Sequence, residues 1–461
     1  MNKYFLLSGF LITIATVTAF GQNFAEHVVG TQADGAHFVR IADMDNDGDK
    51  DLVSSSEFDS DLRLYVNNGN QGFTDNILTW VTAANLLVLD FDEDNDADIF
   101  TTCGSDGTIS WFRNLGGGSF NTAATYNESS NRSAYLVLAD IDQDDDLDII
   151  SARNEGAASS NLTWHENDGY NQFSAQQTIA ANTNVERLMT GDVNNDGYPE
   201  IFTVSNGSVK WYANNFGSIA VIGTTIDNTT SARTLDFADL NNDGFKDLIV
   251  GSWDFMKPLA WYRNNGGASF SAYQLISNQF SLIHQVKAAD MDNDGDMDVV
   301  GSDDYGGNKI IWFANTNGNG TFGTVRTVKN GILSAHGIDI ADIDDDGDLD
   351  VAATSSQSDQ VLWYENQMSV GVETVDAEAI ALQATFTPLS DQVLVSFTAT
   401  QTDNAQLILY SMDGKAIAQQ TVQINMGQNS FHLPTPNLPK GMYCLQVINT
   451  TQSAATKLMK W

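Results

Sequence analysis

The sequence predicts an all-β protein, a seven-bladed β-propeller followed by a small β-sandwich. Three observations support this. An acidic motif of nine residues recurs seven times at intervals of 47 to 52 residues. A Trp-x-x-Asn motif recurs in the same phase, with Leu64 in the Trp place of the first repeat. The helical period of 3.6 residues is missing, and a fixed period of this length points to a propeller or a solenoid.

Residues 1–21 have the layout of a signal peptide. Lys3 precedes an apolar run from Phe5 to Phe20, and small residues follow near the expected cleavage point at Gly21. The run is short for a membrane anchor, so we expect export rather than insertion. Two cysteines, Cys103 and Cys444, are too few for a disulfide framework.

The charge of the chain is strongly negative and unevenly placed. The chain has 21 basic and 60 acidic residues, a formal net charge of −39, and more than half of the acids lie in the seven acidic motifs. A surface of this sign repels nucleic acid and anionic lipid, so neither is an expected partner. The clustered carboxylates instead require cations.

Each repeat contains four short runs that are typical of strands. In the first repeat these runs are "HFVRIAD", "DLVSSS", "LRLYVNNG" and "FTDNILTW". Four strands in each of seven repeats predict seven propeller blades. The seventh repeat lacks a fourth run after Gln367, whereas the start of the mature chain offers one at 24–29. We therefore expect a closed propeller over 22–368 whose last blade is completed by the N-terminal strand.

The acidic motif has the spacing of a calcium loop, D-x-[DN]-x-[DN]-x-x-x-[DE]. Side-chain oxygens at positions 1, 3, 5 and 9 converge in a tight loop, and the carbonyl at position 7 adds another hard ligand, which suits calcium better than zinc. An EF-hand is excluded, because it needs a Glu at position 12 and flanking helices. We predict up to seven structural Ca²⁺ sites. Their ligands are Asp43, Asp45, Asp47, Asp49 and Asp51; Asp90, Asp92, Asp94, Asp96 and Asp98; Asp140, Asp142, Asp144, Asp146 and Asp148; Asp192, Asn194, Asp196, Tyr198 and Glu200; Asp239, Asn241, Asp243, Phe245 and Asp247; Asp290, Asp292, Asp294, Asp296 and Asp298; and Asp342, Asp344, Asp346, Asp348 and Asp350.

Two kinds of departure from the motif predict weaker sites. Asn95 and Asp145 stand where Gly would allow the sharp turn at position 6. Asn194 and Asn241 lower the charge of the fourth and fifth loops. We expect these sites to bind calcium less tightly.

The loops, the Trp-x-x-Asn motif and a Gly-rich stretch before Phe resemble the FG-GAP or VCBS-type repeats of integrin-like β-propellers. The resemblance covers roughly 23–367. It implies that each loop joins the first and second strands of a blade on one face. It also implies a structural role for calcium and a ligand on the opposite face.

The segment 375–461, after a linker at 369–374, alternates apolar and polar residues between turn signals. This pattern predicts a β-sandwich of about seven strands. The stretches "LILYSMDGKAI", "LPKGMYCLQV" and "KLMKW" resemble the C-terminal sorting domain of the bacterial type IX secretion system. The resemblance implies passage across the outer membrane, the secretion machinery as a partner, and a secreted or surface location.

Candidate ligand residues lie six positions before the first Asp of several loops. At this position repeats one, six and seven carry histidine, and repeat five carries arginine. These side chains would gather at the channel mouth opposite the calcium loops, as a transition-metal site, as an anion pocket, or as the polar lining of a wet channel. Aromatic residues in nearby loops suit a glycan or peptide. The candidates are His37, Arg233, Trp253, His284, Tyr305 and His336.

Two functions therefore remain open. One is a non-catalytic, calcium-stabilised binding or adhesion module for glycan or protein. The other is a polysaccharide-degrading enzyme, for example a lyase, that uses His284 or His336 near Arg233. No nucleophile elbow, zinc-protease motif or P-loop is present in the sequence. Purely structural display is a third possibility.

Overall fold

The computed structural model describes most of the chain. Its described residues are 23–69, 72–80, 83–103, 108–121, 124–126, 135–152, 161–170, 172–181, 183–228, 231–254, 256–267, 269–280, 282–304, 306–323, 325–367, 382–386, 392–399, 401–411, 416–435, 438, 441–449 and 453–460. The expected signal peptide, 1–21, and the expected linker, 369–374, lie outside them. The described residues form two compact units, Phe24–Gln367 and a unit within Met368–Trp461.

The first unit contains repeated four-stranded sheets, and neighbouring strands within 36–367 are antiparallel. In the order of the strands across each sheet, the seven sheets are β2 (Ala36–Ala42), β3 (Asp51–Ser56), β4 (Asp61–Asn67) and β5 (Phe73–Trp80); β6 (Ala83–Leu89), β7 (Asp98–Cys103), β8 (Ile109–Phe112) and β9 (Ala124–Tyr126); β10 (Tyr135–Ala139), β11 (Asp148–Ala152), β12 (Leu162–His165) and β13 (Gln177–Ala180); β14 (Val185–Gly191), β15 (Glu200–Ser205), β16 (Ser208–Tyr212) and β19 (Thr224–Asp227); β20 (Ala232–Ala238), β21 (Asp247–Ser252), β22 (Leu259–Tyr262) and β23 (Gln274–Ser277); β24 (Ile283–Ala289), β25 (Asp298–Asp303), β26 (Lys309–Phe313) and β27 (Arg326–Asn330); and β28 (Ala335–Ala341), β29 (Asp350–Ser355), β30 (Gln360–Gln367) and β1 (Asn23–Gly30).

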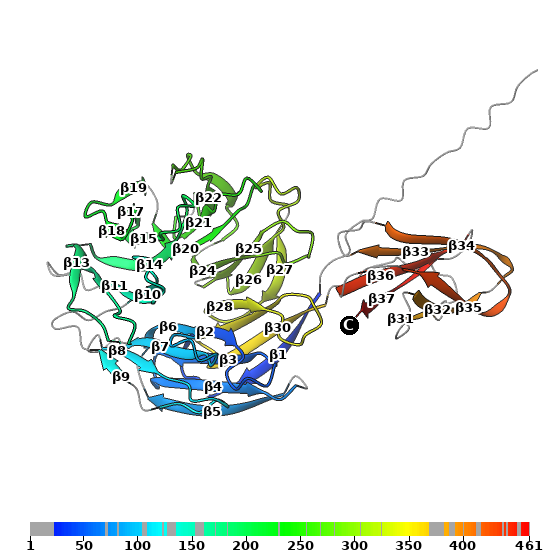
Figure 1. Ribbon diagram of the computed structural model, residues 1–461, viewed down its shortest axis with the longest axis horizontal. Helices are drawn as coiled ribbons and strands as arrows, with labels where there is room; N and C mark the ends of the chain where they lie inside the picture. The colour runs from blue at the N-terminus through cyan, green and yellow to red at the C-terminus, as the bar shows by residue number, and fades with distance from the viewer. Residues whose placement is uncertain are drawn as a thin grey trace, which may run out of the picture. The chain divides into compact units, whose positions relative to one another are not determined.

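The sheets are arranged around a common centre. Each first strand contacts the first strand of the next sheet, from β2 through β6, β10, β14, β20 and β24 to β28, and β28 contacts β2 (Figure 1). The described residues contain no helix. A short ribbon of β17 (Asn214–Asn215) and β18 (Ser218–Ile219) completes this unit. The predicted all-β class is therefore confirmed, and the ring of repeated sheets is consistent with a propeller.

Burial is greatest in the second strand of the sheets, lower in the innermost strand and lowest in the outermost strand. Every residue of β3 is buried, as in β15, β21, β25 and β29, whereas most residues of β5 are exposed. A strand packed on both faces favours a run of small and apolar residues such as "DLVSSS" without strict alternation. The core therefore lies between neighbouring sheets.

The Trp residues of the Trp-x-x-Asn motif belong to this core. Trp363 of β30 packs in one apolar cluster with Val39 and Leu52 of the β2–β5 sheet. Trp312 of β26 likewise shares a cluster with Ile338 of β28, and both Trp residues are fully buried. Each indole thus buries a large apolar surface between two sheets, which accounts for its recurrence in phase with the repeat.

In the second unit, the described residues form seven strands in two sheets that enclose one apolar cluster. Val395 and Phe397 of one sheet pack with Leu407 and Leu445 of the other. Cys444 of this unit is buried. The sheets are β31 (Gln383–Phe386), β32 (Gln392–Ala399) and β35 (Gly427–Pro434), and β34 (Ala416–Ile424), β33 (Asp403–Ser411), β36 (Gly441–Ile448) and β37 (Ser453–Lys460).

Candidate functional sites

The acidic loops share one hydrogen-bond pattern, in which position 1 is the first Asp of each loop. In the second loop, Asp90 accepts the backbone N–H groups of Asp94 at 3.1 Å and Asn95 at 3.0 Å. The carboxylate at position 5, Asp94, accepts the N–H of Asp96 at 3.1 Å. The other loops repeat these bonds with few omissions. The pattern folds the loop back on itself, so its side chains converge.

Two positions of each loop have left-handed backbone. Position 6 has positive φ in every loop, including Asn95 at 70° and Asp145 at 73°, where Gly was expected. Position 4 is left-handed as well, for example Asn46 at 60° and Glu93 at 59°. The strain expected at Asn95 and Asp145 follows from these angles. The left-handed position 4 was not anticipated, although four of its seven residues are Asn, which tolerates this conformation.

The carboxylate at position 9 is a buried structural anchor. Asp350 accepts the N–H of Ile343 at 2.9 Å and that of Asn366 at 2.7 Å. Equivalent pairs of bonds anchor Asp51, Asp148, Asp247 and Asp298, and all seven position-9 residues are fully buried. Burial raises the pKa of Asp51 and Asp98 to about 6, of Asp148, Glu200 and Asp247 to about 7, and of Asp298 and Asp350 to about 8. The sequence predicted a metal ligand at position 9; the structure adds this anchoring role.

The donor set of the loops fits a hard divalent cation. Carboxylate oxygens of Asp90, Asp92 and Asp94 lie within 4.8 Å of one another, and the same holds for trios in the first, third and sixth loops. Several of these oxygens, among them Oδ1 of Asp43, Asp92, Asp142 and Asp292, are buried with no hydrogen-bond partner. A buried carboxylate oxygen without a partner is costly, and a coordinated cation would remove that cost.

Among the described residues, the Asn of the Trp-x-x-Asn motif links its loop to a neighbouring loop in six of the seven repeats. Asn264 Nδ2 donates to the carbonyl of Lys246 in its own loop at 3.1 Å and to that of Val193 in the preceding loop at 2.6 Å. Asn67 makes the same link to Ile343, between the first and the seventh sheets. The sequence marked this Asn only as a repeat marker. Its invariance in all seven repeats was the available signal.

Three predicted ligand residues meet at the other end of the innermost strands. His37, His284 and His336 are each the second residue of β2, β24 and β28, and each offers a ring nitrogen within 4.8 Å of the others. The rings of His284 and His336 are stacked, with their centroids 4.3 Å apart. The His37 ring lies edge-on to both, with its centroid 5.3 Å from that of His284 and 4.9 Å from that of His336. Since the loops follow the last residue of these strands, the three histidines, called the histidine cluster below, lie at the opposite end.

Two members of the histidine cluster, His37 and His284, have lowered pKa values. Burial, together with the charges of His336 and Arg187, lowers the pKa of His37 to about 3. Burial also lowers the pKa of His284 far below its usual value. His336 Nε2 lies 3.2 Å from Asp304 Oδ2, and Ser334 Oγ donates to the other Asp304 oxygen at 2.7 Å. Asp304 therefore holds the orientation of the His336 ring.

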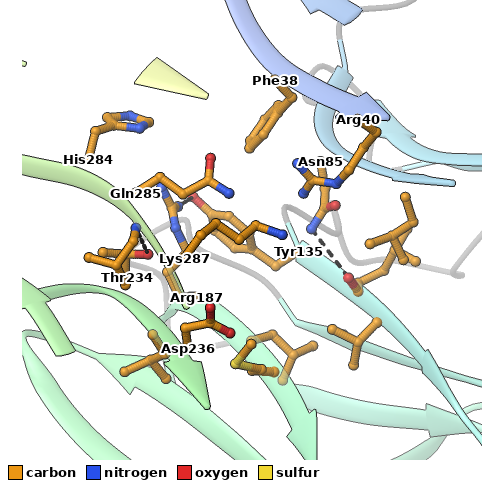
Figure 2. A pocket seen from close by; sticks show the side chains of 17 residues that line it. Phe38, Arg40, Asn85, Tyr135, Arg187, Thr234, Asp236, His284, Gln285 and Lys287 are labelled. Carbon is orange, nitrogen blue, oxygen red and sulfur yellow. Dashed lines mark hydrogen bonds between the residues drawn. The ribbon is translucent and has the colours of Figure 1, made fainter. Parts of the chain in front are cut away.

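A cavity of about 190 Å³ continues along the axis of the ring. Arg40 of β2 and Gln285 and Lys287 of β24 reach into it, and His284 lines its edge (Figure 2). Lys287 Nζ forms an ion pair with Asp339 at 2.9 Å. Arg187 donates to Tyr135 Oη at 2.5 Å. The cavity is thus rich in cationic donors, although the chain as a whole is acidic.

Arg233 and Trp253 form a second group at this end of the ring. The Arg233 guanidinium lies 3.9 Å from the Trp253 ring centroid and forms an ion pair with Glu186. Trp253 Nε1 donates to the carbonyl of Ile283, next to His284, at 3.2 Å, and Trp253 remains 39% exposed. Tyr305, the other predicted ligand residue, lies outside the described residues.

Comparison with protein families identifies both parts of the chain. Six overlapping stretches match the FG-GAP-like repeat, at residues 43–101, 90–151, 140–203, 192–250, 239–301 and 290–353, and together they span more than half of the chain. Residues 387–460 match the secretion system C-terminal sorting domain. Both expected resemblances are confirmed, and the sorting domain indicates type IX secretion to the cell surface or the extracellular space. The described residues contain no helix long and apolar enough to cross a membrane.

Solved structures with a similar fold are only distantly related in sequence. BBS1N, solved in complex with ARL6DN, is 12% identical over 75% of this chain and 97% of its own, with a TM-score of 0.51. An Agrocybe aegerita lectin that recognises non-reducing terminal N-acetylglucosamine is 20% identical over 64% of this chain and 81% of its own, with a TM-score of 0.49. At such identities the likeness concerns the fold alone. No curated protein matches the sequence.

Proposed function

Because this chain belongs to the FG-GAP-like repeat family and carries a secretion-system sorting domain, we propose that it is a calcium-stabilised, seven-bladed binding module outside the cell. It acts without catalysis, as an adhesion or recognition module for a glycan or a protein. The sorting domain delivers it, and the propeller binds the ligand. The proposed blade count rests on the seven four-stranded sheets, since the family match covers six repeats.

The calcium proposal rests on the buried carboxylate oxygens of the acidic loops. In the second loop, Asp90, Asp92 and Asp94 would supply side-chain oxygens, and Asp96 a carbonyl. A bound calcium would neutralise the repulsion among these charges and hold the hairpin between the first and second strands. The loops of lower charge, which contain Asn194 and Asn241, would bind more weakly.

The observation that carries the binding function is the exposed Trp253 with Arg233 against its ring. An exposed indole beside a guanidinium offers both an apolar face for a sugar ring or peptide and hydrogen-bond donors. The pair lies at the end of the innermost strands opposite the loops, because Trp253 bonds to Ile283 at the start of β24. The ring therefore has one end suited to cations and another suited to a ligand.

The proposal is tested with the mature protein, with millimolar calcium or with excess chelator. We expect chelation to lower the unfolding midpoint strongly, since each site at 100 times its Kd contributes about 2.7 kcal/mol. On a glycan and protein array we expect calcium-dependent retention of a ligand without cleavage. An unchanged midpoint would contradict structural calcium, and product release would replace the binding function by an enzymatic one.

Two variants separate the binding face from general stability. Trp253→Ala should weaken ligand retention about tenfold, because it removes an aromatic contact worth roughly 1 kcal/mol beyond its buried area. Trp80→Ala is the matched control, since Trp80 is 75% exposed on the outer strand β5. Equal retention by both variants would place the ligand elsewhere.

A further inference from the structure

The histidine cluster has the geometry of a metal site that the acidic loops do not explain. Its members come from three neighbouring sheets, and their ring nitrogens lie within 4.8 Å of one another. Three imidazoles on rigid strands are a recurrent ligand set for transition metals, whereas calcium prefers oxygen ligands. The two kinds of candidate site therefore differ in the class of cation that they suit.

The hydrogen bonds of the cluster leave ligand atoms free. Nδ1 of His284 and Nδ1 of His336 are buried and have no hydrogen-bond partner. The other nitrogen of His336, Nε2, is next to the carboxylate of Asp304, which Ser334 holds in place. A carboxylate on the remote nitrogen fixes the tautomer of a metal-ligating histidine and orients its ring. Asp304 thus leaves Nδ1 of His336 as the atom that faces a metal.

We propose that His37, His284 and His336 bind one divalent transition-metal ion of the zinc class, with Asp304 as the positioning residue for His336. Three nitrogens bound to a tetrahedral ion at about 2.0–2.1 Å lie about 3.3 Å from one another. The stacked rings of His284 and His336 must therefore rotate modestly out of their parallel arrangement to bind one ion. The fourth coordination position opens toward the axial cavity, because His284 also lines it. There, Arg40, Arg187 and Lys287 would favour a small anion as the fourth ligand.

The test is a titration of the full mature chain with Co²⁺ in millimolar Ca²⁺, which keeps Co²⁺ from the acidic loops. We expect one equivalent of Co²⁺ to produce the visible absorption of a four-coordinate ion, and Zn²⁺ to displace it. If the wild-type chain shows no such absorption and binds no Zn²⁺ under these conditions, the proposal is wrong. This result is independent of the proposed calcium function, because the calcium concentration is constant throughout the titration.

Three variants assign the ligands. His284→Gln should weaken Co²⁺ binding at least a hundredfold, and Asp304→Asn, which alters only ring positioning, should weaken it about tenfold to a hundredfold. His165→Gln is the control, since His165 lies on β12 and is not part of the cluster. Circular dichroism verifies folding, and His37→Gln replaces His284→Gln if the latter fails to fold. Unchanged binding in the folded ligand variant would overturn the proposal.

Discussion

The two ends of the innermost strands differ in how much their residues vary from repeat to repeat. At the loop end, all seven repeats carry the same chemistry, and its hydrogen bonds recur almost bond for bond. At the other end, the equivalent position changes from His37 to Glu186 to Arg233. A position that repeats serves the fold, since every blade needs it. A position that varies around the ring is free to form one asymmetric site.

Loss of the position-9 anchor should produce the largest effect. Asp350→Ala leaves the buried N–H groups of Ile343 and Asn366 without an acceptor, so the free energy of unfolding should fall by about 3–5 kcal/mol. Asp49→Ala is the control, because the half-buried side chain at position 7 is removed while its carbonyl is retained. Urea unfolding in calcium measures both. A loss below about 1 kcal/mol for Asp350→Ala would show that this anchor is dispensable.

The Asn link between loops should have the next largest effect. Asn264→Ala removes the bonds donated to Val193 and Lys246 and the bond accepted from the Gly266 N–H, and we expect a loss of about 2–3 kcal/mol. Asn167 is a natural comparison, since its side chain donates only to Leu147 among the described residues. Asn167→Ala should therefore cost about 1 kcal/mol. Equal losses in urea unfolding would show that the bond across the sheets adds no stability.

Within the axial cavity, Lys287→Met should have a smaller, pH-dependent effect. Burial raises the pKa of Asp339, but Lys287 and Arg40 outweigh it and hold this pKa below its usual value. A lowered pKa adds stability above the unfolded-state value, and this contribution disappears as the pH falls through the folded-state value. We expect Lys287→Met to cost about 1–2 kcal/mol at pH 7 and less below about pH 4. A cost independent of pH would assign the effect to packing.

The smallest effects should come from backbone conformation. Asp145→Gly relieves a left-handed residue at φ 73° and should raise the free energy of unfolding by about 0.5–1 kcal/mol. Gly48→Ala should lower the free energy of unfolding by about 1 kcal/mol, because alanine is strained at a φ of 101°. A steric clash does not contribute, since an added Cβ meets no atom within 4 Å. Thermal unfolding in chelator compares them. If both variants changed the free energy of unfolding in the same direction, charge or packing, rather than φ, would determine the effect of substitutions at position 6.

Much of the architecture followed from the sequence, because repetition makes local patterns visible. The phase of the acidic motif and the short strand-like runs predicted an all-β chain of repeated sheets, and the final segment was recognised from its own motifs. The spacing of the histidines from each loop also placed them at the same level of adjacent strands. Strand register carries such local spacing directly into three dimensions.

The partners of individual side chains were decided only by the tertiary structure. That Asp350 anchors Asn366 depends on the pairing of β29 with β30. That Asn264 reaches the preceding loop and that Arg233 pairs with Glu186 depends on contacts between sheets. The sequence could not reveal these contacts, because each joins residues 16 to 71 positions apart. Their geometry depends on the twist and spacing of neighbouring sheets. The sequence by itself thus determined which residues repeat and which vary, and packing between the sheets determined what each of them touches.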